Sequence, residues 1–166
     1  MRFLTLVIIV VAFLFSIHGT SQSLQADSTS NQKTMIKTFS YVAIPCTDFE
    51  RAFKFYFEIT GGLIQRNPSV SFPMAYFTDR EYNYVGHLFR LEGMTHPSGG
   101  TVSFKPSSDG VIIYMELEKD LTTTLTKIEK AGGKVIMPKT LIAPGKGYWA
   151  LFLDTEGNKL ALHSVE

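Results

Sequence analysis

Two titratable side chains with complementary chemistry lie in strand-like segments of the second half of the chain. Glu116 falls in the segment 111–117 and His163 in the segment 159–164, and both alternate with apolar residues. Successive side chains of a strand point to opposite faces, so Glu116 and His163 lie opposite the apolar residues of their own strands. An imidazole beside a carboxylate can act as a general base or as a polar anchor. The alternative, solvated positions at the strand ends, stays open.

Further candidates accompany this pair. Tyr41 and Tyr114 alternate with apolar residues, and their rings can stack on an apolar ligand while their hydroxyls form hydrogen bonds. Arg90 could clamp a carboxylate or a phosphate, and Trp149, the only Trp, follows a Gly-rich loop. The alternatives are ordinary packing for the aromatic residues and an outward, solubilising position for Arg90. The predicted ligand-binding residues are therefore Tyr41, Arg90, Tyr114, Glu116, Trp149 and His163, and no catalytic residue is assigned.

The other reactive residue types give weaker patterns. His87 and His96 have no partner at a recognised ligand spacing, so we interpret both as surface or loop residues. Cys46 is the only Cys, which excludes an intrachain disulfide. It has no basic neighbour in sequence, and we do not predict a nucleophile there.

The N-terminal segment has the composition of a targeting signal. Arg2 is followed by an unbroken apolar run, 6–15, and then by small and polar residues up to position 26. This order predicts a secretory signal peptide over residues 1–26. A spanning helix needs ~20 apolar residues, and this run is shorter. Residues 27–35 are polar without a period and predict a disordered tether. We therefore expect a secreted or periplasmic protein with no stable membrane anchor after cleavage.

The remaining chain, 36–166, contains one plan twice. Segments 39–64 and 110–136 each open with a β-type run, turn at an Asp, continue with helical spacing and end at a Gly pair. Thr47 and Glu50 predict a capping box for the first helix, and Asp120 predicts the N-cap of the second. The predicted buried stripes are Phe49, Ala52, Phe53, Tyr56 and Phe57 in the first helix and Leu121, Leu125, Ile128 and Ala131 in the second.

Three strands are predicted after each helix. In the first copy they cover 63–66, 74–79 and 84–92, and in the second copy 134–137, 148–154 and 159–164. A Gly-, Ser- and Pro-rich stretch, 93–108, links module one (36–92) to module two (109–166), with a short strand at 102–105. Each copy is thus βαβββ. Neither can cover its sheet alone, so we expect the two to pair as one α+β domain.

Three stretches of the sequence resemble those of a known family. The stretches VAIPCTDFERAFKFY, DLTTTLTKIEKAGGKVIMPKT and GKGYWALFLDTEGNKLALHS resemble the vicinal oxygen chelate superfamily, which includes glyoxalase I, bleomycin-resistance proteins and extradiol dioxygenases. The nearest branch is the set of uncharacterised proteins related to lactoylglutathione lyase. The resemblance implies two paired βαβββ modules that form a U-shaped β-sheet cup with the helices outside.

The resemblance also implies a divalent metal, held by His, Gln or Glu on the first and last strands of each module. The implied positions here are Tyr41, Ile112 and Ala161, and a fourth near Phe89 or Arg90. None of these residues is a usual divalent-metal ligand. We therefore predict no metal and no other cofactor, although a metal held elsewhere stays open.

Three functions remain open on the sequence. The favoured one is a domain that binds a small organic molecule in its cup without the family's usual metal. The second is a lactoylglutathione-lyase-related or dioxygenase-like enzyme, a lyase or isomerase for a small carbonyl compound, with a displaced metal set that includes Glu116 and His163. The third is a non-catalytic interaction module of the cell envelope. The net charge of +1 gives no sign of a nucleic-acid partner, and a homodimer stays open.

Overall fold

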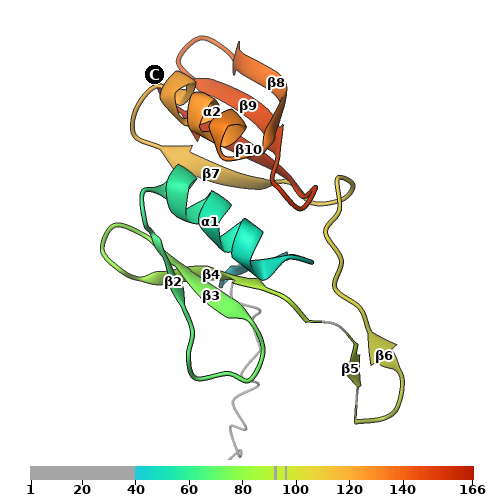
Figure 1. Cartoon of the computed structure of the whole chain (residues 1–166). Helices are drawn as coiled ribbons and strands as arrows, with labels where there is room; N and C mark the ends of the chain where they lie inside the picture. The colour runs from blue at the N-terminus through green and yellow to red at the C-terminus, as the bar shows by residue number, and fades with distance from the viewer. Residues whose placement is uncertain (1–39, 92, 96) are drawn as a thin grey trace, which may run out of the picture. The chain divides into compact units, whose positions relative to one another are not determined.

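Module one of the computed structural model follows the βαβββ order, with the helix on one side of the sheet (Figure 1). The described residues of the chain are 40–91, 93–95 and 97–166, so the predicted signal peptide, the tether and His96 lie outside them. The sheet order is β1-β4-β3-β2. The elements are β1 (Val42–Pro45), α1 (Phe49–Thr60), β2 (Ile64–Arg66), β3 (Met74–Thr78) and β4 (Tyr84–Phe89).

Module two repeats this plan with the strand order β7-β10-β9-β8. In each module the first strand pairs in parallel with the last, and the other pairs are antiparallel. The predicted α+β class and the βαβββ repeat are confirmed. The elements are β7 (Ile113–Leu117), α2 (Leu121–Lys130), β8 (Lys134–Leu141), β9 (Tyr148–Leu153) and β10 (Lys159–Ser164).

The linker contains a small hairpin of its own. Strands β5 (Met94–Thr95) and β6 (Thr101–Val102) pair with each other and join neither large sheet. The short strand predicted at 102–105 therefore ends earlier than expected. No helix among the described residues is long and apolar enough to span a membrane.

One predicted helix cap is wrong and the other is confirmed. The predicted capping box at Thr47 is wrong, because α1 begins after Asp48, whose carboxylate accepts a hydrogen bond from Arg51 N at 3.1 Å. Glu50 instead pairs with Arg66 of β2 at 2.8 and 2.5 Å. The prediction for α2 is confirmed, since Asp120 accepts from Thr122 N at 3.0 Å.

The buried face of α1 is turned relative to the prediction. Phe57 is 48% exposed, whereas Phe55, which the predicted stripe left out, is completely buried. The cause lies in the second module: the ring of Phe55 packs 6.3 Å from that of Phe152 on β9. The helix therefore packs against residues of both modules. Its buried residues are Phe49, Ala52, Phe55, Tyr56 and Ile59.

Both modules share one hydrophobic core. Buried residues of α1, β1, β3 and β4 belong to the same cluster as Leu121 and Ile128 of α2 and residues of β9 and β10. The predicted stripe of α2 is confirmed, because Leu125 and Ala131 also pack on this core. Burial of apolar surface contributes about 25 cal/mol per Å². The shared core is therefore a main reason why the modules form one unit, Lys37–Glu166.

Candidate functional site

The strand registers decide which side chains face away from the core. Ile44 pairs with Leu88 and Met115 pairs with Leu162, and all of these belong to the core or pack on it. Their neighbours along each strand must point the other way. We call the face of each sheet that is turned away from the core its open face. The predicted phase of β1, β7 and β10 is confirmed, except that Val111 precedes β7 and is 91% exposed.

Four of the predicted residues come together on the open face of module two. His163 of β10 lies opposite Glu116 of β7 on one side and Trp149 of β9 on the other. The imidazole Nδ1 and Glu116 Oε2 are 2.7 Å apart. The rings of Tyr114 and Trp149 are nearly parallel, with 6.4 Å between their centroids and 12° between their planes. This group combines an ion pair with aromatic surface.

A tight loop holds the second nitrogen of His163. Nε2 lies 3.2 Å from the carbonyl oxygen of Lys146. Gly147 adopts φ 76°, and a Cβ there would lie 2.1 Å from the carbonyl oxygen of Ser164, so only Gly fits beside β10. The hydrogen bond to Glu116, followed by that to the Lys146 carbonyl, raises the pKa of His163 above its usual value. Both nitrogens therefore face acceptors, as suits the protonated ring.

A second aromatic group occupies the open face of module one. His87 of β4 pairs with Ala43 and Tyr76 on its two sides. Its Nδ1 lies 2.7 Å from the hydroxyl of Tyr84. The ring of Tyr41 lies 5.4 Å from that of Tyr84 and 5.5 Å from that of His87. Burial lowers the pKa of His87 below its usual value.

This group corrects the interpretation of His87 as a surface or loop residue. The side chain is half-buried in the middle of a paired strand. The alternation of His87 with Gly86 and Leu88 inside the predicted strand 84–92 was the signal available in the sequence. It places His87 on the same face as Tyr41, which precedes β1.

The remaining predicted residues do not all join these groups. Tyr41 belongs to the module-one group, and no contact between described residues joins it directly to Tyr114, Glu116 or His163. Arg90 directly follows β4 and is exposed. Its charge lowers the pKa of Cys46, so Arg90 lies near Cys46 at the C-terminal end of β4. The two open faces are connected at one edge, where Arg80 of the β3–β4 turn and Glu118 after β7 form an ion pair at 2.6 Å.

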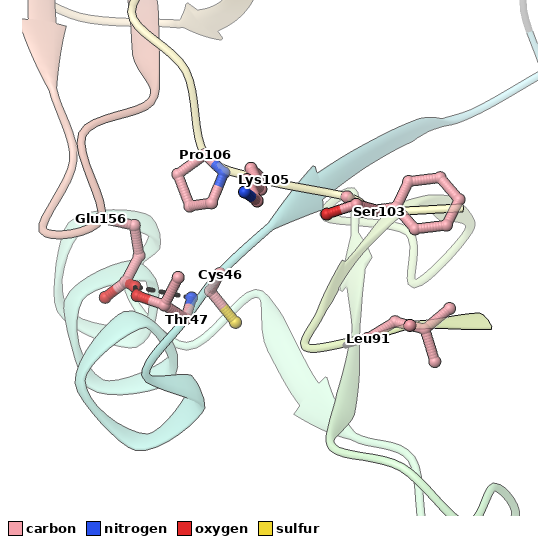
Figure 2. A pocket seen from close by; sticks show the side chains of 9 residues that line it. Cys46, Thr47, Leu91, Ser103, Lys105, Pro106 and Glu156 are labelled. Atoms are coloured by element: carbon pink, nitrogen blue, oxygen red, sulfur yellow. Dashed lines mark hydrogen bonds between the residues drawn. The ribbon is translucent and has the colours of Figure 1, made fainter. Parts of the chain in front are cut away.

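A pocket of about 470 Å³ lies beside the start of α1 (Figure 2). Cys46, Phe104, Lys105 and Glu156 help to line it. The Glu156 carboxylate is already engaged with the backbone of Thr47 and Asp48, and burial, followed by nearby carboxylates, raises the pKa of Cys46 to about 12. The pocket therefore offers neither a thiolate nor a free carboxylate.

Comparison with known proteins agrees with this architecture. The model of the glyoxalase/bleomycin resistance protein/dioxygenase superfamily matches residues 38–162. The chain belongs to this superfamily. A glyoxylase-like domain-containing protein of Didymella fabae is 31% identical over 123 residues, which cover 74% of this chain and 90% of the relative.

Solved structures of other proteins share the fold of this glyoxalase-like domain. A glyoxalase-related enzyme from Fulvimarina pelagi has a TM-score of 0.57 and 15% identity, over 78% of this chain and 88% of its own. A fosfomycin resistance protein from Listeria monocytogenes, complexed with Mn(II) and sulfate, has a TM-score of 0.55 and 14% identity, over 78% and 91%. At these identities the likeness extends to the fold alone.

The registers fix the fourth metal position that the superfamily implies. Ala161 pairs with Tyr114, two residues after Ile112, and His87 pairs with Ala43, two residues after Tyr41. The module-one counterpart of Ala161 is therefore His87. This position lies two residues before Phe89 and three before Arg90, the two residues near which the sequence predicted it.

The side chains at the four positions do not fit a divalent ion. They offer one phenol from Tyr41 and one imidazole from His87, while Ile112 and Ala161 offer only hydrocarbon. Divalent ions in such sites take several imidazole or carboxylate ligands. In the described part of the chain, no group of three His, Cys, Asp or Glu side chains is arranged to hold a metal ion.

Proposed function

We propose that this glyoxalase-like domain binds a small aromatic organic molecule on the open faces of its sheets, without a divalent metal at the superfamily's usual positions. The observation that carries the proposal is the aromatic surface of these faces. Tyr41 is 55% exposed, Tyr84 43% and Tyr114 51%, although all three belong to or adjoin strands of the sheets. Contiguous exposed apolar surface marks an interaction or ligand-binding site.

The polar groups on the same faces suit a ligand with few charges. Ligand sites are mostly apolar, with a small number of placed polar groups that fix orientation. His163 and Glu116 satisfy one another, and Tyr84 satisfies one nitrogen of His87. The aromatic rings therefore supply most of the contact area, and few side chains are left to recognise polar atoms.

The position of Arg80 and Glu118 supports a ligand that touches both faces. Their ion pair connects the turn before β4, where Tyr84 lies, to the end of β7, where Glu116 lies. Both side chains are well exposed, at 71% and 63%, so the pair contributes little to stability.

One observation favours an enzyme as the second candidate. The carboxylate of Glu116 orients Nδ1 of His163, as in an acid–base pair. However, Nε2 faces the Lys146 carbonyl, and the ring would have to release it before accepting a proton from a substrate. A lyase or isomerase acting on a small carbonyl compound thus remains the alternative proposal. An interaction module of the cell envelope is the third.

An NMR titration of the purified protein with acetophenone tests the proposed function. Trp149 is the only Trp, so its indole N–H gives a single, assigned signal. We expect this signal and the amides of β4 and β10 to shift with a common saturation curve. Unchanged signals on both open faces, or shifts confined to the pocket beside Cys46, would contradict the proposal. Stoichiometric Zn, Mn, Ni or Fe in elemental analysis would overturn its metal-free part.

Export and self-association are separate proposals. The pattern of residues 1–26 supports cleavage of a signal peptide and release of the domain into the periplasm or medium. N-terminal sequencing of the protein from each cell fraction tests this. A homodimer would be detected by light scattering across a concentration series.

A further inference from the structure

Among the described residues, the polar contacts on the two open faces leave one imidazole nitrogen without a hydrogen-bond partner. His163 has acceptors on both nitrogens, from Glu116 and the Lys146 carbonyl. His87 has a partner on Nδ1 only, the hydroxyl of Tyr84, and no hydrogen bond from its Nε2 to any described residue is present. His87 can therefore offer one ring nitrogen to a ligand, whereas both nitrogens of His163 are engaged.

The proton on His87 can be assigned from its partner. A phenol is a stronger hydrogen-bond donor than a neutral imidazole N–H, so the Tyr84 hydroxyl donates to the Nδ1 lone pair. The neutral ring then carries its single proton on Nε2. Burial, which lowers the pKa of His87 and raises that of Tyr84, favours both groups in the neutral form that this arrangement requires.

We infer that His87, held by Tyr84, donates its Nε2–H to an acceptor oxygen of the aromatic ligand, such as a carbonyl or ether oxygen. This inference rests on the proposed function and adds the chemical class of the ligand. Tyr84 is a positioning residue, because it acts through His87. The proposed acceptor is uncharged, because the described contacts of the half-buried His87 are with Tyr41, Tyr84 and Phe89 and include no Lys or Arg.

The surrounding rings restrict the shape of the ligand. The rings of Tyr41 and Phe89 both lie close to His87, with centroids 5.5 and 5.3 Å from the imidazole. Tyr41 is exposed, whereas Phe89 is buried and its ring lies 5.3 Å from that of Phe104 of the linker. An aromatic ring can therefore lie against Tyr41 while its oxygen reaches His87. This geometry selects aromatic ketones and ethers over aromatic hydrocarbons of the same shape.

A matched pair of ligands tests the inference. Acetophenone and ethylbenzene have nearly the same shape, but only acetophenone has an acceptor oxygen. We expect the protein to bind acetophenone about two- to tenfold more tightly, since one net hydrogen bond supplies such a ratio. His87→Phe keeps the ring and removes the donor, so it should bring the ratio close to one while ethylbenzene still binds.

The positioning role of Tyr84 has its own readout. In ¹⁵N NMR of the unmodified protein, His87 should show the neutral form protonated on Nε2. Tyr84→Phe should give a mixture of tautomers and a smaller preference for acetophenone, whereas Tyr82→Phe, in the exposed turn two residues earlier, should change neither.

The outcomes separate this inference from the proposed function. If neither ligand binds, the proposed function fails. If both bind equally well to the unmodified protein, or if His87 is protonated on Nδ1, the role of His87 is wrong while the aromatic site stands. A ratio that survives in His87→Phe would also overturn the inference.

Discussion

The carboxylate of Glu156 accepts a hydrogen bond from the backbone N–H of Thr47, 109 residues earlier in the chain, at 2.8 Å. The hydroxyl of Thr47 and the backbone N–H of Asp48 donate to the same oxygen, Oε2, at 2.7 and 3.0 Å. Arg51 of α1 pairs with the other oxygen. The turn after β9 in module two thus supplies the acceptor for the N–H groups at the start of the helix in module one.

Two neighbours in the same turn extend this connection. Asp154 accepts a hydrogen bond from the buried hydroxyl of Tyr56 at 2.7 Å. Asn158 donates to the carbonyl of Pro45 at 2.9 Å and accepts from Ser107 N at 3.1 Å. The three side chains connect module two to β1, α1 and the linker. They keep the modules, and with them the two open faces, in a fixed relationship.

Glu156→Gln should therefore destabilise the whole domain. The amide keeps one oxygen but loses the charge. Its NH₂ group must then face other donors, either those of Thr47 and Asp48 or that of Arg51. We expect the free energy of unfolding to fall by about 1–3 kcal/mol, because hydrogen bonds to a charged group contribute more than those to a neutral one. Urea denaturation measures this. Glu58→Gln on the exposed side of α1 is the matched control, and an equal loss in both variants would contradict the connecting role.

The same carboxylate predicts an acid-dependent stability. Burial raises the pKa of Glu156, but hydrogen bonds from Asp48 and Thr47 outweigh it, so that the folded pKa lies below the usual 4.5. A lowered pKa contributes stability above the unfolded value, and this is lost as the pH falls through the folded value. The difference in unfolding free energy between the native protein and Glu156→Gln should therefore shrink below about pH 4.5. A difference that grows on acidification would contradict this.

Tyr56→Phe isolates the second contact of this turn. Tyr56 is fully buried, and loss of its hydroxyl leaves the buried Asp154 carboxylate with one donor fewer. The expected loss is about 1–2 kcal/mol in unfolding free energy. Tyr82→Phe makes the same chemical change at a side chain that is 73% exposed, and it should leave stability within about 0.5 kcal/mol.

The sequence predicted those parts of the fold that depend on local periodicity. Alternation placed Ile44, Leu160 and Leu162 in the core, and the Asp120 cap followed from its position before an apolar stripe. The face of α1 could not be predicted this way. Its phenylalanines are so frequent that several stripes fit, and the choice depends on Phe152 in the other module.

The candidate site was predicted better in module two than in module one. Glu116 and His163 lie opposite each other because their strands are parallel neighbours. His87 was missed because its partner, Tyr84, lies on the same strand at a spacing with no recognised ligand motif. Likewise, Thr47 fits a capping box locally, and only the tertiary contact with Glu156 assigns its hydroxyl elsewhere.

The contact between Glu116 and His163 predicts a raised pKa for the imidazole. The hydrogen bond to Glu116 raises the pKa of His163 above 6.5, with the Lys146 carbonyl as the second cause. A raised pKa means that the stability contributed by this pair is fully present below the unfolded pKa and is lost as the pH rises through the folded one. Glu116→Gln should bring the pKa of His163 back toward 6.5, as followed by NMR of its ring protons.

A neighbouring carboxylate provides the control for this titration. Glu118 lies two residues further on and pairs with Arg80 instead of His163. Glu118→Gln should leave the pKa of His163 nearly unchanged. Equal shifts in the two variants would mean that the general charge of the surface, and not the contact at Glu116, sets the titration.

The thiol of Cys46 should be inert in the folded protein. Burial of the side chain, which is 3% exposed, is the first cause of its pKa of about 12, and the nearby carboxylates of Glu156 and Asp154 raise it further. Its Sγ also lies 3.3 Å from the carbonyl oxygen of Phe89, to which the thiol donates.

Because the thiolate is the reactive form, Ellman's reagent at pH 8 should modify Cys46 only as fast as the domain opens. In guanidinium chloride the reaction should be complete at once, and Glu156→Gln should accelerate it under native conditions by weakening the start of α1. Rapid modification of the native protein would show that the pocket beside Cys46 is open to reagents and that its thiol ionises.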